Sequence, residues 1–361
     1  MPTDAALDRA THFLARAQSL APDSENVLAV QAAVLDFEGG PDYRRALSEQ
    51  RAVAQRLVGL YPNNTVGYFR LGVTDKLAGK YDDAARNLAK AISLNPLNPY
   101  IKNFYWNMAY CMIFAGHDRD GLVWADRALA AQGDLASFKY RALLTARAVA
   151  HYRTGDLAAA KRLVAELNER YPFDTWRGHS PADPDSKTDR EQTQSVRDAL
   201  KAAGSRDHLD PGADFGASPQ DVLYQSGEGK TPTAAPGVTT VNTDALAAML
   251  EQDKPLIVDT MDSSWYRSVP GAVGLDFGGN AHGTFGDEIE KRLARKLHDL
   301  TGGEMARPIV AMAFNVARFD GYDLALRMRH AGYTNVYWYR GGREAWEVAG
   351  KPEDVVRPAD W

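Results

Sequence analysis

Apolar residues in the first 173 positions recur at the three- and four-residue spacing of amphipathic helices, with short breaks at Gly or Pro-Asn. The clearest register contains Tyr68, Leu71, Gly72, Gly79, Tyr81, Ala84, Leu88, Ala91 and Pro96. A second register begins near Tyr105, and a third runs from Ala148 to Pro172. One pair of helices cannot bury its apolar face alone, so at least three pairs must stack. The pattern predicts an all-α superhelix with a concave groove, formed by an N-terminal helix within residues 1–25 and helical repeats over 26–173.

These registers resemble the tetratricopeptide repeat (TPR), whose period is 34 residues. The resemblance implies that the first helix of each pair faces the groove. We therefore expect the groove to be an apolar, aromatic strip that takes a protein or peptide ligand. Its predicted side chains are Phe69, Val73, Trp106, Tyr110, Ile113 and Tyr152.

The same side chains could instead pack only against neighbouring repeats, because aromatic residues serve cores and binding grooves equally well. Trp106 distinguishes the two interpretations. If it is a binding residue, Trp106→Ala weakens partner capture and leaves the fold intact. If it is a core residue, the same change lowers stability.

After residue 237 the pattern changes to short apolar runs that alternate with helical stretches. Strands are predicted at Leu256–Asp259, Ala272–Leu275, Ile309–Phe314 and Asn335–Tyr339, and helices near Asp244–Glu251, Asp287–Leu300, Gly321–Ala331 and Arg343–Val348. This order predicts a three-layer α/β domain over residues 238–361, with a mostly parallel sheet. Residues 174–237 are rich in Gly, Pro, Ser and Asp around one helical stretch, and are predicted to form a capping helix and a linker.

Several stretches in residues 240–350 resemble the rhodanese-like domain, and in particular the quinoprotein-associated members named for a CXXCW motif. They are Leu256–Asp259, Val269–Ala272, Pro308–Tyr322, Ala331–Tyr337 and Arg340–Trp346. The resemblance implies that the family's catalytic cysteine falls on Asn315 and its second cysteine on Arg318. Asp320 then stands where the general rhodanese loop has an arginine.

Sulfur transfer in this family needs a thiolate of lowered pKa, and an asparagine cannot form a persulfide. We therefore expect a catalytically inactive loop, which consists of Asn315, Val316, Ala317, Arg318, Phe319 and Asp320. Its backbone N–H groups, next to the start of a helix, are expected to keep weak affinity for an anion. Cys111, the one cysteine, falls in a helical segment and is predicted to be a buried structural residue.

The composition argues against several classes of partner. A net charge of −5 provides no basic surface for nucleic acid, and no stretch of 18 uninterrupted apolar residues occurs to span a membrane. The eight histidines are dispersed without metal-ligand spacing, so neither metal nor cofactor is expected. The acidic N-terminal stretch lacks the pattern of a secretory signal, and we expect a cytoplasmic, bacterial protein.

The favoured interpretation is a non-enzymatic adaptor, in which a TPR groove is joined to an inactive rhodanese-like domain. One alternative is an enzyme whose loop binds an oxyanion substrate and uses Asp320 or His282. Another is the regulatory half of a cyclase-type signalling system, because residues 185–215 resemble the cap that follows such repeats in some bacterial class III cyclases. Asp259, at the end of a predicted strand, is interpreted as a structural residue rather than a catalytic one.

Overall fold

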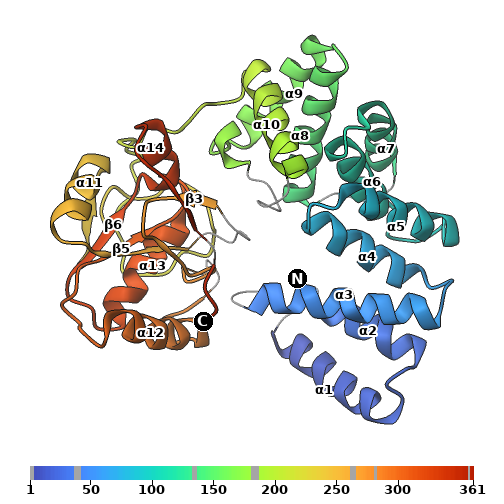
Figure 1. The fold of residues 1–361 in the computed structure, drawn as a ribbon, viewed down its shortest axis with the longest axis horizontal. Coiled ribbons are helices and arrows are strands. Elements are labelled where there is room, and N and C mark those ends of the chain that lie inside the picture. Colours follow the sequence, from blue (N-terminus) through green and yellow to red (C-terminus); the bar gives the residue numbers. More distant parts are fainter. Residues whose placement is uncertain are drawn as a thin grey trace. The chain divides into compact units, whose positions relative to one another are not determined.

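The structure is a computed structural model that describes residues 4–35, 42–131, 136–179, 187–260, 266–279, 283–356 and 358–361. Chain contacts divide it into two compact units (Figure 1). The helical unit comprises Met1–Tyr171 and Asp185–Ser205, and the sheet unit comprises Pro172–Pro184 and Arg206–Trp361. His282, named in one alternative above, lies outside the described residues.

Antiparallel helix pairs build the helical unit, as the apolar spacing predicts (Figure 1). The helices are α1 (Asp4–Leu20), α2 (Glu25–Val34), α3 (Tyr43–Leu60), α4 (Thr65–Leu77), α5 (Tyr81–Leu94), α6 (Ile101–Phe114), α7 (Asp118–Ala130), α8 (Ser137–Arg153), α9 (Leu157–Arg170) and α10 (Lys187–Ala202). Glycines allow the close pairing, since a Cβ on Gly72 of α4 would lie 2.6 Å from Leu88 Cγ of α5. The helix α10 packs against α8 and ends the stack.

The repeat interval is longer than the 34 residues expected. Corresponding glycines, Gly79 and Gly116, stand 37 positions apart, and the next one is Gly155. The turn within the pair α4 and α5 is short, whereas the chain between α5 and α6 runs from residue 95 to residue 100. The extra residues therefore lie between helix pairs, where Asn98 and Tyr100 border the groove described below.

A parallel sheet forms the centre of the sheet unit, with the strand order β1-β6-β5-β2-β4 among the described residues (Figure 1). Its strands are β1 (Thr239–Val241), β2 (Leu256–Asp259), β4 (Val273–Gly274), β5 (Ile309–Met312) and β6 (Val336–Tyr339). The strands β3 (Tyr266–Ser268) and β7 (Asp354–Val356) form a separate antiparallel pair. The helices are α11 (Thr243–Gln252), α12 (Glu288–Thr301), α13 (Phe319–His330) and α14 (Gly342–Val348), with the short 3-10 turn η3 (Trp176–Gly178).

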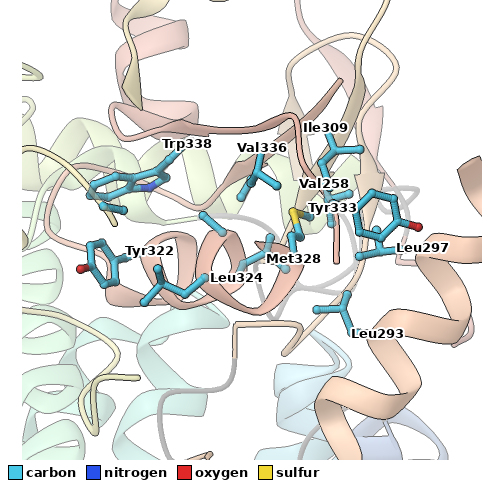
Figure 2. Packing of buried hydrophobic residues seen from close by; sticks show 14 of the residues in the cluster. Val258, Leu293, Leu297, Ile309, Tyr322, Leu324, Met328, Tyr333, Val336 and Trp338 are labelled. Atoms are coloured by element: carbon cyan, nitrogen blue, oxygen red, sulfur yellow. The ribbon is translucent and has the colours of Figure 1, made fainter. Parts of the chain in front are cut away.

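Alternate residues of the central strands face opposite layers, as the pleat requires. Figure 2 shows one layer, in which Val258, Ile309, Val336 and Trp338 of the sheet meet Tyr322, Leu324 and Met328 of α13 and Leu293 and Leu297 of α12. On the other face, Ile257, Val310, Met312 and Tyr339 pack with Leu246 of α11 and Trp346 of α14. The three-layer α/β architecture follows from this alternation.

The described residues between 172 and 237 belong to the two compact units and do not form a detached connection. The helix α10 belongs to the helical unit, whereas residues 172–179 and 206–237 pack within the sheet unit. We call residues 206–231 the strap. Its backbone hydrogen bonds, described below, are irregular, and no periodicity in the sequence predicts them.

Candidate functional site

The loop between β5 and α13 stands at the carboxyl end of a central strand, where parallel sheets place their ligand loops. It continues the buried strand β5, and α13 begins at Phe319, two residues earlier than the sequence predicted. The carbonyls of Ala313 and Phe314 accept the N–H groups of Arg343 and Glu344, at 3.1 and 2.9 Å. Gly342 makes this close approach possible, with φ +62° and no room for a Cβ, which would lie 2.4 Å from the Ala313 carbonyl oxygen.

Asn315, which the resemblance places at the family's nucleophile position, has its side chain folded inward. It is 4% exposed, and its Oδ1 accepts the N–H of Ala317 at 3.1 Å. The N–H of Arg318 donates to the Asn315 carbonyl at 3.1 Å, and that of Phe319 donates to the Gly227 carbonyl at 3.0 Å. Three consecutive N–H groups are thus bonded inside the protein, so the predicted anion would have to use other donors of the loop.

The strap covers this loop through backbone contacts. The N–H of Gly229 donates to the Ala317 carbonyl at 2.8 Å, and the Thr231 hydroxyl donates to the Val316 carbonyl. The ring of Tyr224 stacks on that of Phe319, with centroids 3.9 Å apart. Gly229 must be small here, because a Cβ would lie 2.7 Å from the Phe319 ring. Sequence reasoning missed this cover, since irregular backbone pairing leaves no periodic signal.

The charged side chains at the loop contact one another as ion pairs. Arg318 Nε donates to Asp320 Oδ2 at 2.8 Å, and Arg318 Nη1 lies 3.9 Å from the carboxylate of Glu228 in the strap. The structure therefore shows Arg318 and Asp320 as an ion pair. A carboxylate held in this way is a poor candidate for a catalytic base.

Polar groups around the loop are buried and engaged. Asp259 is fully buried, accepts the Ser268 hydroxyl at 2.7 Å and lies 4.0 Å from Arg343 Nε, so its carboxylate contacts two neighbouring side chains. Arg340 donates to the Thr231 carbonyl and hydroxyl of the strap, both at 3.2 Å, and burial lowers its pKa. Burial also raises the pKa of Glu344, which accepts the Thr175 hydroxyl at 2.5 Å.

Asp323 on α13 connects the strap to the helix that follows the loop. Its side chain is fully buried, and its Oδ1 accepts the N–H of Tyr224 at 3.1 Å. Burial raises its pKa to about 8, against the opposing effect of that hydrogen bond. The hydroxyl of Tyr322, one residue earlier, donates to the Gln220 carbonyl at 2.6 Å and accepts its N–H at 3.0 Å.

The helical unit contains a second candidate site, a groove of about 700 Å³ along the first helices of three pairs, α4, α6 and α8. It is lined by Tyr43, Val66, Phe69, Arg70, Val73, Lys76, Asn98, Tyr100, Asn103, Phe104, Trp106, Asn107, Phe138 and Lys139. Its volume matches sites that take small molecules or a few peptide side chains. We call it the α4–α8 groove.

Three of the six predicted groove residues, Phe69, Val73 and Trp106, line the α4–α8 groove. The other three lie elsewhere. Ile113 is fully buried against Gly121 of α7, Tyr110 stacks on Phe114 with centroids 4.2 Å apart, and Tyr152 is 37% exposed at the far end of α8.

Trp106 is a core residue as well as a groove residue. Only 6% of it is exposed, it packs with Ala109, Ala125 and Leu143, and its Nε1 donates to the Lys139 carbonyl at 2.8 Å. This burial argues against the expectation that Trp106→Ala leaves the fold intact.

The expectation of an apolar strip is also incomplete, because three cations line the groove. Lys76 Nζ lies 4.2 Å and Lys139 Nζ 5.8 Å from the centroid of the Trp106 ring, close enough for cation–π attraction. Arg70 is the third. Sequence position alone did not reveal the pair, since Lys139 enters from α8 and meets Lys76 only in the folded stack.

Cys111 lies in the core of the helical unit, where burial raises its thiol pKa to about 12. It is neither exposed nor part of the loop at Asn315. Among the described residues, no cluster of three His, Cys, Asp or Glu side chains could hold a metal ion. The described helices also include none that is long and apolar enough to cross a membrane.

Comparison with known proteins agrees with this division. Residues 242–349 match the model of the rhodanese-like domain, and no curated protein sequence matches the chain. A solved TPR protein with an unusual peptide-binding site is 12% identical over 53% of this chain and 95% of its own, with a TM-score of 0.36. A thermophilic TPR protein from Thermus thermophilus is 16% identical over 55% and 91%, with a TM-score of 0.33. A mutant O-GlcNAc transferase from Thermobaculum terrenum is 14% identical over 88% and 50%, with a TM-score of 0.35.

These TM-scores are too low to support the repeat assignment. The assignment rests instead on the helix pairs and on the small residues where the helices cross, described above. Residues 242–349 form a rhodanese-like domain, which this chain joins to TPR-like helical repeats.

Proposed function

We propose that the protein is a non-enzymatic adaptor that holds a peptide segment of a partner in the α4–α8 groove. The observation that carries this proposal is the groove itself, which brings together side chains from three successive helix pairs. Two aromatic side chains at its edge, Tyr100 and Phe138, are 71% and 60% exposed. Exposed aromatic side chains beside a concave surface are typical of recognition sites.

The rhodanese-like domain supports a non-enzymatic function. Asn315 supplies no thiolate, the loop lies under the strap, and Asp320 is paired with Arg318. We infer that this domain anchors the strap and does not transfer sulfur. An enzymatic function based on Asp320 would have to break its ion pair first.

Affinity selection on the full-length chain tests the proposal. A displayed library of random twelve-residue peptides is selected against the wild type, and recovered peptides are tested for binding to a Tyr100→Ala/Phe138→Ala variant. These exposed side chains leave the core intact when truncated, so we expect the variant to fold and to bind at least tenfold more weakly. Recovery of no peptide, or equal binding to the variant, would refute a peptide-binding groove.

Sulfurtransferase activity is measured on the same protein, with thiosulfate as donor and cyanide as acceptor. We expect no thiocyanate above a blank without protein. Turnover would refute the inactive-domain part of the proposal and leave the groove part standing.

A further inference from the structure

We propose that the strap is a latch whose hold on the sheet unit weakens as two buried carboxyl groups, those of Asp323 and Glu344, lose their protons. This inference concerns the sheet unit and does not depend on the α4–α8 groove. The two acids occupy equivalent places in the fold. Asp323 is on α13, the helix that follows β5, and Glu344 is on α14, the helix that follows β6. Because β5 and β6 are neighbouring parallel strands, both helices begin at the same edge of the sheet.

Each acid accepts a backbone N–H of the strap. Oδ1 of Asp323 accepts the N–H of Tyr224 at 3.1 Å, and Oε2 of Glu344 accepts the N–H of Leu209 at 2.9 Å. Both acids are enclosed, with exposed fractions of 0% and 1%. Water reaches such a carboxyl group only when the segment that covers it moves, so its ionisation is coupled to the position of the strap.

The surroundings of Asp323 favour the neutral acid while the strap is in place. Its Oδ2 has no hydrogen-bond partner among the described residues, which is costly for an ionised carboxylate. Burial raises its pKa to about 8, and the charge of Asp320 adds to the rise, whereas the N–H of Tyr224 and the charge of Arg327 oppose it. The phenols of Tyr224 and Tyr322 also face Asp323, but burial raises the pKa of both, so they stay neutral while Asp323 titrates.

The one cation that acts on Asp323 also serves two other acids. Arg327 donates to both carboxylate oxygens of Asp287 at 2.8 Å, and its Nη1 lies 3.5 Å from Glu290 of α12. Two negative charges already face this guanidinium. It therefore compensates an ionised Asp323 only in part, which agrees with the raised pKa of that acid.

Glu344 holds the beginning of the strap in a similar setting. Its Oε1 accepts the hydroxyl of Thr175 at 2.5 Å. Burial raises its pKa, and the hydrogen bonds from Leu209 and Thr175 and the charges of His208 and Arg177 act in the opposite direction. Its ionisation is therefore expected to loosen the strap with the same sign as that of Asp323.

The direction of the effect follows from linkage. When the strap lifts, Asp323 meets water and its pKa returns from about 8 toward its ordinary value of 3.8. The latch is then tightest at low pH, and the opening constant of the strap rises about tenfold per pH unit between pH 5 and pH 8. An open strap uncovers the loop backbone, because it releases the N–H of Phe319 and the carbonyls of Val316 and Ala317.

Native-state hydrogen exchange of the full-length chain tests this inference. Exchange is followed by mass spectrometry at pH 5, 6, 7 and 8 without denaturant, and each protection factor is corrected for the intrinsic pH dependence of amide exchange. Strap peptides are compared with peptides from β5. The variants are Asp323→Asn, Asp323→Ser and Glu344→Gln. Asp221→Asn is the matched control, because Asp221 is a strap residue that pairs with Arg329 of α13 and is 52% exposed.

We expect the protection of the wild-type strap to fall about tenfold per pH unit and to stay below that of β5. Both Asp323 variants should lose most of this slope at Tyr224, and Glu344→Gln should reduce it at Leu209. Asp221→Asn should lower strap protection by one factor at every pH and keep the wild-type slope.

A flat wild-type profile would overturn the inference, whether or not each variant folds. So would a wild-type slope at Tyr224 in a folded Asp323 variant. Equal protection of the strap and β5 at every pH would show unfolding of the whole unit in place of a latch.

Discussion

Replacing Asp323 with asparagine is expected to remove most of the pH dependence of the sheet unit's stability between pH 4 and pH 8. Asp323 is fully buried, and its Oδ2 has no hydrogen-bond partner among the described residues. Burial raises its pKa from 3.8 to about 8. The folded state therefore keeps this proton to a higher pH than the unfolded chain does.

The sign and the size follow from linkage. Stabilisation by the bound proton is complete below the unfolded pKa, near 4, and is lost as the pH rises through the folded pKa. The loss is about 1.4 kcal/mol per pH unit, or about 5 kcal/mol over the window. Asparagine keeps an oxygen for the Tyr224 N–H and carries no charge, so the variant should be the more stable protein at pH 8. Glu344, whose pKa is also raised by burial, contributes a pH dependence of the same sign in both proteins.

Urea unfolding of the full-length chain measures this effect. Samples equilibrated at pH 5, 6, 7 and 8 are labelled by a hydrogen-exchange pulse at one fixed pH, and peptides from β5 and α13 report the midpoint. Asp299→Asn is the matched control, because that side chain is 79% exposed. If the midpoint of Asp323→Asn falls between pH 5 and pH 8 as much as that of the wild type, Asp323 is not the responsible group.

Three more substitutions probe the loop, the groove and the backbone. Asn315→Cys should give no thiocyanate in the thiosulfate assay, because position 315 is buried; turnover would show that substrate reaches it. Trp106→Ala should lower the stability of the helical unit by about 3 kcal/mol in urea unfolding, since it empties a core position, and an unchanged midpoint would make Trp106 a groove residue alone. Gly342→Ala should cost the sheet unit more than about 1 kcal/mol, through its φ of +62° and the Ala313 carbonyl, and a wild-type melting temperature would contradict that strain.

The sequence predicted those elements whose packing imposes a period. The helices α4 to α9 follow from apolar spacing, and the strands β2 and β5 from uninterrupted apolar runs that are buried on both faces. The expected repeat period of 34 residues was wrong, because the connection between α5 and α6 is longer than expected. Its residues, which include Tyr100, have the composition of an ordinary turn. An insertion in a loop between helices gives no periodic signal.

The remainder could not be predicted because it depends on tertiary contacts. Nothing in the sequence around Gly227 and Gly229 shows that their backbone pairs with the loop at Ala317 and Phe319, roughly ninety positions away. The same holds for Lys76 and Lys139, which meet only through the stacking of α4, α6 and α8. The ion pair of Arg318 with Asp320 is local, since the two residues are two positions apart in the chain.

The missing nucleophile and the covered loop have a common physical consequence. A sulfurtransferase loop must leave its N–H groups open to a substrate, whereas here Ala317, Arg318 and Phe319 direct theirs to Asn315 and to the strap. Each such bond contributes about 1 kcal/mol net, and only if the loop stays in one conformation. If the domain does not transfer sulfur, as proposed above, the closed loop can serve without catalytic cost as an attachment point for residues 206–231. We infer that the rhodanese-like domain holds this strap in place and that the groove of the helical unit binds the ligand.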